Sequence, residues 1–285
     1  MKNRLVVGIG LSALIGILAR WRGMLTTGGV VGSMLIGTIV FGVGGLAWSI
    51  VVVTFFVSSS LLSRVSSGRK RQVAADKFSK PGARDLFQTI ANGGVGTLAT
   101  LAYGISRGRS AWLQAAFVGA FATATADTWA TEIGTLAHSQ PRLITTGKRV
   151  PPGTSGGMTW LGTTAALAGG LTLGVTAALA SGRLSKGRSS PGAGFVAAGL
   201  TGGLCGALVD SLLGATAQRV YYCPRCESET ERTVHYCGMR TRPLRGAGWV
   251  DNDMVNLLST ACGAAMAAST YLLLARTDAS PSGRP

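Results

Sequence analysis

The sequence predicts an all-α fold, a polytopic bundle of about seven to eight transmembrane helices, and three observations lead to this prediction. Hydrophobic residues make up 47% of the 285 residues, whereas charged residues make up only 13%. Mean hydropathy is positive, at +0.35. The chain also contains several apolar runs of about 20 residues, the length that a helix needs to cross a bilayer. We therefore expect one integral membrane domain over residues 1–285.

The first two apolar runs differ in length. The run near residues 5–19 is short, lacks a small-residue cleavage site and is followed directly by basic residues, so we expect an uncleaved and half-inserted helix. The run over 28–63 would be roughly 54 Å long as a single helix, which exceeds a hydrocarbon core of about 30 Å. We predict that this run folds back at residues 42–45, which gives eight spans.

Five further apolar runs complete the predicted bundle. Glycine, alanine, serine and threonine dominate them, and such small residues let helix backbones approach closely in lipid. We therefore expect most of the 42 glycines to serve helix packing. The five runs lie near residues 87–105, 113–137, 158–180, 194–218 and 253–275.

The net charge of +16 fits membrane topology better than nucleic-acid binding. With eight spans, the loops after spans one, three, five and seven hold 18 of the 27 lysines and arginines. Basic loops stay in the cytoplasm and contact anionic headgroups. We therefore place both termini outside, and we expect the lipid bilayer, and no nucleic acid, as a partner. The compact loops and the lack of a transit sequence favour a prokaryotic plasma membrane.

Carboxylates in apolar stretches are the main functional clue. Asp127 and Glu132 lie in FATATADTWATEIGTL, and Asp210 lies in GLTGGLCGALVDSLLGATA. An ionised carboxylate in hydrocarbon is costly, so such groups usually face a cavity, a metal or a counter-ion. Asp251 and Asp253 open the last span on the same predicted side of the membrane. We predict one shared cavity; the alternative is that these acids are structural and pair with threonines or an arginine.

Two segments near these acids could hold phosphate. The glycine-rich turn in KRVPPGTSGG exposes backbone N–H groups before a helix, an arrangement that binds anions, although it could also be an ordinary loop that caps the helix. A second segment ends in Arg84, and Asn92 follows inside an apolar run, where its amide needs polar partners. The candidate residues of the turn are Lys148, Arg149, Gly153, Thr154, Ser155, Gly156 and Gly157.

The segment CPRCESETERTVHYC contains Cys223, Cys226, His235 and Cys237. One C-x-x-C followed by a nearby H-x-C supplies four ligands for a small tetrahedral zinc site. The alternative is a set of unligated thiols, since a cytoplasmic position disfavours a permanent disulfide. We expect a cytoplasmic Cys/His knuckle at 220–248 that holds a structural Zn2+.

Long ordered motifs make the chain similar to a known family. It resembles a family of integral membrane proteins with an uncharacterised domain, which includes the animal transmembrane protein nineteen and the plant phytyl-phosphate kinase of the vitamin E pathway. In that family the knuckle looks like an insertion of some members, which argues against a direct chemical role. The motifs are SSSLLSR at 58–64, the segment from Arg84-Asp85 to Gly93-Gly94, ADTWATEIG at 126–134, PRLITT and VPPGTSGG within 141–157, VDSLLGATAQ at 209–218 and DNDMVN at 251–256.

The resemblance implies a phosphotransferase that converts an isoprenyl, phytyl-like monophosphate to the diphosphate with a nucleoside triphosphate, the expected donor being CTP. Asp127, Asp210 and Asp253 are then expected to bind Mg2+, with Glu132 as a further ligand or water-positioning residue. Arg84 and Asn92 would hold the acceptor phosphate, and the glycine-rich turn with its two cations would hold the nucleotide. The alternatives are a transporter or flippase of a lipid or isoprenoid phosphate, and a lipid-phosphate cytidylyltransferase.

Overall fold

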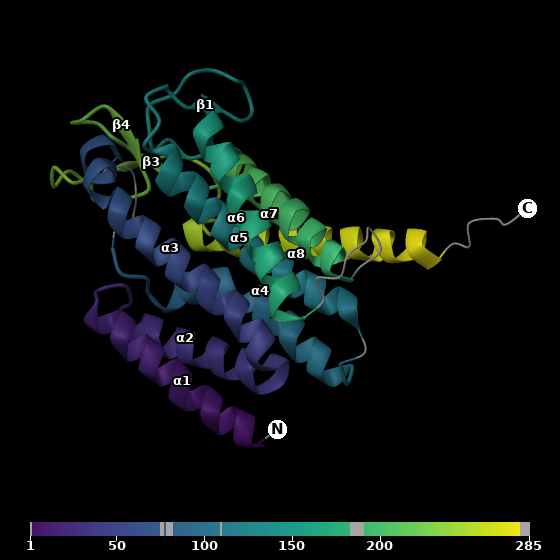
Figure 1. The fold of residues 1–285 in the computed structure, drawn as a ribbon. Coiled ribbons are helices and arrows are strands. Elements are labelled where there is room, and N and C mark those ends of the chain that lie inside the picture. Colours follow the sequence, from purple (N-terminus) through teal and green to yellow (C-terminus); the bar gives the residue numbers. More distant parts are fainter. Residues whose placement is uncertain (1, 75–76, 78–81, 109, 183–190, 280–285) are drawn as a thin grey trace, which may run out of the picture.

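The computed structural model describes the whole chain except residues 1, 75–76, 78–81, 109, 183–190 and 280–285 (Figure 1). Its described residues form eight α-helices, one π-helical turn and five short strands. The helices are α1 (Lys2–Trp21), α2 (Thr27–Ile39), α3 (Gly45–Ala74), α4 (Leu86–Ile105), α5 (Ala111–Gly134), α6 (Trp160–Ala180), α7 (Pro191–Thr216) and α8 (Asn252–Ala279). The strands are β1 (Arg142–Leu143), β2 (Gly157–Met158), β3 (Val220–Cys223), β4 (Ser228–Thr230) and β5 (Arg242–Arg245).

The predicted helical membrane bundle is confirmed. Five described segments are long and apolar enough to cross a membrane. The α4 and α5 helices are not among them, because polar side chains such as Asn92 and Asp127 make them less apolar. The five segments are Asn3–Trp21, Thr27–Ser66, Trp160–Ala180, Gly192–Thr216 and Asn252–Thr277.

The longest of these segments is broken where the sequence predicted. A π-helical turn, η1, occupies Val40–Gly44, and Gly45 follows with a φ of 73°. A residue with a side chain rarely adopts this backbone conformation, which explains why glycine occupies the position. The α2 helix starts beside the start of α4, where Gly28 lies against Leu86. The α3 helix starts beside the end of α4, so the chain reverses its direction at this turn.

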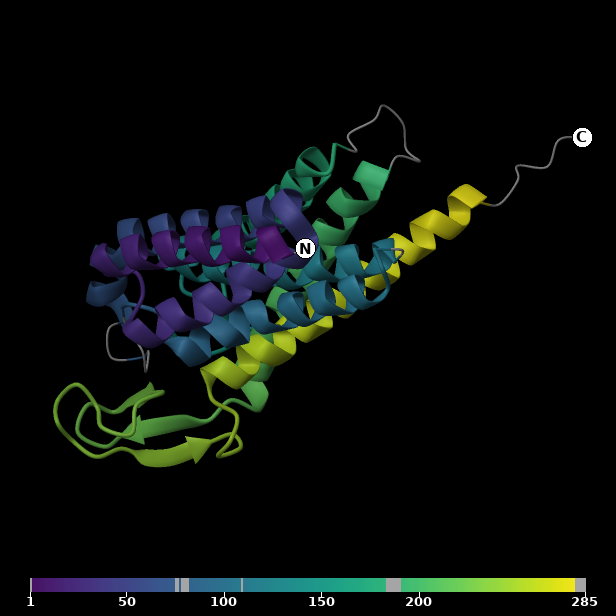
Figure 2. The same ribbon diagram turned by 90° about the horizontal axis from the view of Figure 1, so that it is seen from below.

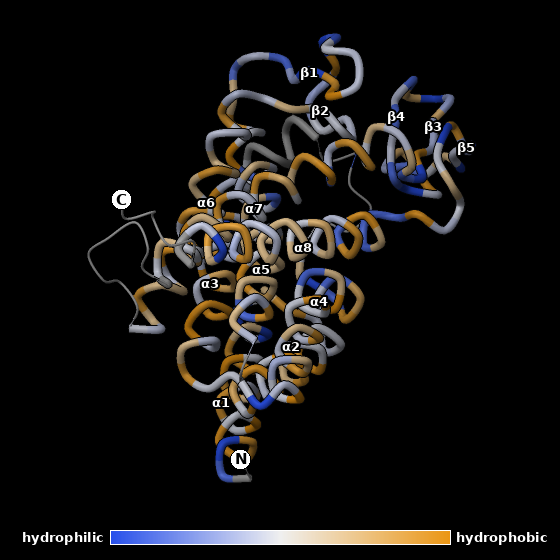
Figure 3. Tube along the Cα trace, turned by 90° about the vertical axis from the view of Figure 1, so that its right-hand side faces the viewer, coloured by the Kyte–Doolittle hydropathy of each residue, from blue (hydrophilic) through white to orange (hydrophobic). Residues whose placement is uncertain are grey.

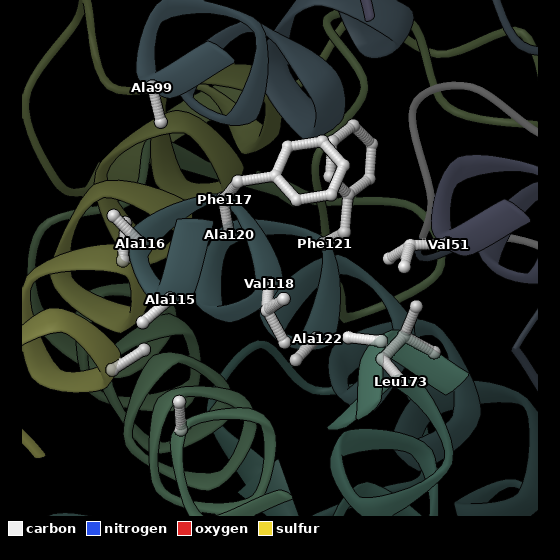
Figure 4. Close-up of a cluster of buried hydrophobic side chains, with 14 of the residues drawn as sticks. Val51, Ala99, Ala115, Ala116, Phe117, Val118, Ala120, Phe121, Ala122 and Leu173 are labelled. Carbon is white, nitrogen blue, oxygen red and sulfur yellow. The ribbon is translucent and has the colours of Figure 1, made fainter. Parts of the chain in front are cut away.

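The α5 helix forms the centre of the bundle. Every residue from Leu113 to Ala126 is buried, and Phe117 and Phe121 of this stretch belong to a cluster of buried hydrophobic side chains that also includes Val51 and Leu173 (Figure 4). The ring of Phe117 lies 4.4 Å from that of Trp48 on α3 and 5.0 Å from that of Phe121, measured between centroids. These rings contribute much of the packing energy, because each aromatic side chain buries a large apolar area against its neighbours.

Small residues bring α5, α7 and α8 together, as expected for lipid-embedded helices. The hydroxyl of Thr123 on α5 donates a 3.0 Å hydrogen bond to the carbonyl of Gly202 on α7. A Cβ at Gly263 on α8 would clash with the side chain of Thr123, and one at Gly206 on α7 would do the same. These two glycines therefore allow a close approach that no larger residue permits.

The all-α prediction did not include the strands, which lie outside the helices at one end of the bundle, here called the loop end (Figure 3). The loops after α1, α3, α5 and α7 meet at this end. The strands β1 and β2 pair as a hairpin, and β4, β3 and β5 form a three-stranded antiparallel sheet. Figure 2 shows this sheet beside the start of α8. It falls within the predicted knuckle at 220–248.

Candidate functional site

A cavity of about 690 Å³ opens at the loop end, and most of the predicted site residues line it. This volume lies within the usual range for small-ligand pockets, roughly 300–1,000 Å³. Its polar walls come from the six helices α3 to α8, the 153–157 turn and the three-stranded segment. Polar lining residues include Ser63, Arg84, Gln88, Asn92, Asp127, Thr128, Thr131, Glu132, Ser155, Asp210, Ser211, Gln218, Glu231, Asn252 and Asn256.

Two of the predicted acids meet in this cavity. Asp127 on α5 and Asp210 on α7 lie close enough for their side chains to interact directly, and the negative charge of Glu231 also acts on Asp210. The hydroxyl of Ser259 on α8 also donates a 3.2 Å hydrogen bond to Asp210. Two carboxyl groups in contact repel each other when both are ionised, which a shared proton or a bound cation relieves. This pair therefore has the chemistry of a cation site.

Glu132 faces a different part of the cavity wall. Only 5% of it is exposed, and its two carboxylate oxygens accept hydrogen bonds from Ser63 and Ser66 on α3, the first at 3.0 Å. Its charge also acts on Arg84. A spacing of five residues turns a helical side chain by roughly 140°, which explains why Asp127 and Glu132 point to different neighbours.

Arg84 is held by its backbone and by its side chain. Its N–H donates to the carbonyl of Met24 and its carbonyl accepts from the N–H of Thr26, both at 3.0 Å. Its guanidinium donates a 3.4 Å hydrogen bond to Ser60 and lies over the ring of Phe55. Burial lowers the pKa of Arg84, whereas Glu132 raises it. An arginine stays protonated in proteins, so a positive charge faces the cavity.

The start of α4 is fixed beside Arg84. Asp85 and Gln88 form a reciprocal capping box at this helix start, with side-chain to backbone hydrogen bonds of 2.9 Å and 3.0 Å. The amide of Asn92, one turn later, donates a 2.8 Å hydrogen bond to the carbonyl of Gln88. Asn92 and Gln88 therefore present one polar face of α4 to the cavity that Arg84 also lines.

The glycine-rich turn forms another wall of the cavity. Gly153 and Gly156 have φ values of 80° and 83°, and Gly156 lies against Ala215 on α7, where a Cβ would clash. Thr159, rather than a residue of the turn, caps α6 by accepting a 3.0 Å hydrogen bond from the Gly162 N–H. A threonine of this loop therefore caps the helix, as the alternative expected, and the whole turn from 153 to 157 also lines the cavity.

Three predicted site residues lie outside the described cavity lining. Lys148 and Arg149 are exposed in the loop between β1 and β2, where the Lys148 carbonyl accepts a 2.9 Å hydrogen bond from the N–H of Leu143. Asp253 is also absent from the described lining, whereas Asn252 and Asn256 belong to it. Those two residues are one turn apart on α8 and therefore lie on the face that lines the cavity. Asp253 lies on a different face of the same helix.

The sequence did not single out Glu231, Gln218 or Tyr236, which also line the cavity. Glu231 stands among several charged residues in ESETER, and nothing in that pattern distinguishes it. Asn256 could have been found, because its spacing of four from Asn252 places two amides on one face at the start of a span.

The predicted zinc ligands come together in the three-stranded segment. Ligand atoms of Cys223, Cys226, His235 and Cys237 all lie within 4.8 Å of one another. The sulfurs of Cys223 and Cys237 are 3.7 Å apart, which matches the roughly 3.8 Å expected between two sulfurs around a tetrahedral zinc. The hydrogen bond from His235 lowers the pKa of Cys237 to about 6, whereas hydrogen bonding to Cys237 raises the pKa of Cys226 to about 11. The four side chains therefore fit a zinc site.

Comparisons with known proteins agree with the membrane fold. The chain is 32% identical to Protein PGR of Arabidopsis thaliana over 272 residues, which cover 90% of this chain and 92% of that protein. It is 29% identical over 273 residues to an uncharacterized membrane protein, MJ0933, of Methanocaldococcus jannaschii, which cover 95% and 96% of the two chains.

A shorter match links the chain to Protein VTE6, chloroplastic, of Arabidopsis thaliana, at 30% identity over 145 residues. These residues cover 50% of this chain and 44% of that protein. No solved structure gives a significant match. Residues 10–264 match the family described as Integral membrane protein DUF92. The chain therefore belongs to the DUF92 family of integral membrane proteins.

Proposed function

We propose that this protein is a membrane-embedded phosphotransferase that converts an isoprenyl, phytyl-like monophosphate to the diphosphate with a nucleoside triphosphate, preferably CTP. The contact between Asp127 and Asp210 in one cavity, with Arg84 in the same cavity, carries this proposal. Paired carboxylates suit a divalent cation, and a guanidinium suits a phosphate. The resemblance to a family that includes the plant phytyl-phosphate kinase supports the same reaction.

The chemistry asks little of the protein beyond positioning and charge. An oxygen of the acceptor phosphate attacks the γ-phosphorus of the donor, the bond from that phosphorus to the β,γ-bridging oxygen breaks, and the nucleoside diphosphate leaves. The acceptor is already ionised, so no strong general base is needed. Catalysis then depends on alignment of the two phosphates and on neutralisation of their charge.

The cavity walls supply these functions. Asp127 and Asp210 would hold Mg2+, which neutralises charge on the donor phosphates. Arg84 and Asn92 would bind the acceptor phosphate, while Glu132 fixes the direction of the Arg84 side chain. The turn at 153–157 would hold the nucleotide through its backbone. The exposed Lys148 and Arg149 are not needed for this arrangement.

The isoprenyl tail needs an apolar path that avoids water. Leu204, Ala207 and Leu208 on α7 line the same cavity as the acids. Leu208 is also 37% exposed, whereas Ala207 beside it is buried. We therefore expect the tail to enter sideways from the bilayer, beside α7.

A product assay with purified protein in detergent tests the proposal. Phytyl, geranylgeranyl and farnesyl monophosphates are each incubated with CTP or ATP, with and without Mg2+. We expect a prenyl diphosphate and the nucleoside diphosphate, and only with Mg2+. Release of pyrophosphate with a CDP-linked lipid would instead identify a cytidylyltransferase. Absence of product in detergent, together with phosphate-lipid movement across sealed vesicles, would identify a transporter.

A further inference from the structure

Tyr236 presents an open aromatic ring at the cavity. It lines the cavity together with the glycine-rich turn, and it is 72% exposed. The Arg232 side chain lies over this ring, with 5.5 Å between the guanidinium carbon and the ring centroid. A guanidinium in this position covers one face of a ring and leaves the other for a second flat group. Because so much of Tyr236 is exposed, the described residues leave that second face open.

The loop that carries Tyr236 is fixed on both sides of this residue. Tyr236 lies between His235 and Cys237, two of the four side chains that fit a zinc site. The N–H of His235 donates a 2.9 Å hydrogen bond to the carbonyl of Met239, and the N–H of Gly238 donates one of the same length to the carbonyl of His235. His235 is also buried. The backbone of Tyr236 is therefore held in place before any ligand binds, which lowers the entropic cost of binding.

A short series of contacts connects Tyr236 to the glycine-rich turn. The Ser155 hydroxyl of the turn donates a 3.5 Å hydrogen bond to Glu231, which also accepts a 2.8 Å hydrogen bond from the Gln218 side chain. Arg232 is the next residue in the chain, and its guanidinium lies over the Tyr236 ring. Only Glu231 and Arg232 therefore separate the ring from the turn, and both ends of this series line the same cavity.

We propose that Tyr236 stacks on the nucleobase of the nucleoside triphosphate whose phosphates the 153–157 turn holds. This inference rests on the proposed function, and it gives the Cys/His segment a part in donor binding. Every nucleobase has a flat π-face, so an aromatic ring binds it by stacking. Arg232 on the other face of the ring adds a cation to the stack. Base binding is no chemical step, which agrees with the expectation that a knuckle of only some family members has no direct chemical role.

Competition binding with purified protein in detergent tests this inference without an assay of activity. Radiolabelled CTP is bound in the presence of Mg2+ and is displaced by unlabelled CTP or by inorganic tripolyphosphate, which has the phosphates but no base. Tyr236→Ala should weaken CTP binding by about 10-fold, which corresponds to about 1.4 kcal/mol, because the base loses its stacking partner. Its inhibition constant for tripolyphosphate should change by less than about 2-fold, since the phosphate contacts remain. Tyr236→Phe keeps the ring and should bind CTP within about 2-fold of the unaltered protein.

Val234→Ala is the matched control. Val234 lies two residues earlier in the same loop, is exposed and is absent from the described cavity lining. We expect this variant to bind CTP within about 2-fold of the unaltered protein, since such surface changes have small effects. Tyr236→Leu keeps an apolar side chain but has no π-face, so it should lose as much CTP affinity as Tyr236→Ala. Hydrogen exchange of residues 220–245 shows that each variant keeps the folded segment.

The outcomes separate this inference from the proposed function. If the unaltered protein binds neither CTP nor tripolyphosphate, the proposed nucleotide site fails together with the inference. If it binds both and the alanine and leucine variants of Tyr236 bind CTP normally, the ring does not contact the base, and the phosphate site stands. If Tyr236→Ala weakens the binding of CTP and tripolyphosphate equally, or Val234→Ala weakens CTP binding as much, the effect comes from the fold of the loop, and the inference is overturned.

Discussion

Asp127 on α5 and Asp210 on α7 are distant in the sequence, yet their side chains interact directly inside the loop-end cavity. Each lies in a helix with few other charged residues, so their contact is the feature that most needs a functional explanation. Replacement of either aspartate by asparagine tests that explanation, because asparagine removes the charge but has nearly the same volume.

Asp127→Asn and Asp210→Asn should each lower the rate of phosphoryl transfer by roughly 100-fold, which corresponds to about 2.7 kcal/mol of activation free energy. The reason is the loss of a charged ligand for the cation. Steady-state rates at saturating Mg2+ measure the effect. Asp251→Asn is the control, because Asp251 is exposed and caps α8, a role that asparagine fills equally well. A comparable loss in that control would contradict a specific role for the buried pair.

Glu132→Gln should raise the KM for the prenyl monophosphate by about 10-fold while kcat changes less, a difference of about 1.4 kcal/mol in binding. Glutamine removes the charge that opposes Arg84, so the guanidinium loses the partner that directs it. Initial rates at varied acceptor concentration measure this split. Ser63→Ala removes one hydrogen bond to Glu132 and keeps its charge, so it should have a smaller effect. An unchanged KM in Glu132→Gln would show that Arg84 does not depend on this acid.

The protein purified without chelators should contain about one zinc per chain, since three cysteines and one histidine form a closed four-ligand set. Cys223→Ser should lose most of this zinc and should lower the temperature at which the extramembrane segment unfolds. Elemental analysis and hydrogen exchange of residues 220–245 measure the two effects. Cys262→Ser, on α8 and outside the cluster, should keep its zinc. Zinc-free protein that does not take up added zinc would contradict the site.

Gly263→Ala should reduce the free energy of unfolding by about 1–3 kcal/mol, because the added methyl group would clash with Thr123 on α5. Thermal unfolding in detergent measures the change. The neighbouring Cys262→Ala is the control, since Cys262 is exposed on the outer side of α8 and its replacement should have little effect. Equal destabilisation by both variants would show that α8, rather than the close contact, is sensitive.

The sequence predicted those parts of the fold that depend on length and on the cost of buried charge. A 36-residue apolar run is too long for one span, which led to the fold-back that η1 and Gly45 form. The cost of a carboxylate in hydrocarbon led to Asp127 and Asp210, and the structure brings these two together. Both arguments use local composition, which the sequence displays directly.

The remaining site depends on contacts that local composition does not display. The side chain of Asp253 was expected in the cavity, but a shift of one residue along a helix turns a side chain by about 100°, and Asn252 and Asn256 line the cavity instead. Lys148 was also expected in the cavity, but it is exposed in the loop between β1 and β2. Glu231 reaches the cavity through a hydrogen bond to Lys77, a contact between segments that are remote in the sequence.

The turn between α2 and α3 has a consequence for how this protein enters a membrane. Residues 40–47, VFGVGGLA, contain no charged side chain, and the N–H of Gly45 donates to the carbonyl of Phe41. The turn lies beside the start of α1, where the Arg4 guanidinium would be 3.5 Å from a Cβ at Gly45. The turn itself adds no charged group that has to cross the bilayer, so α2 and α3 can be inserted together as one hairpin. An arginine introduced at Gly44 would add such a charge, so this position reports whether insertion is concerted.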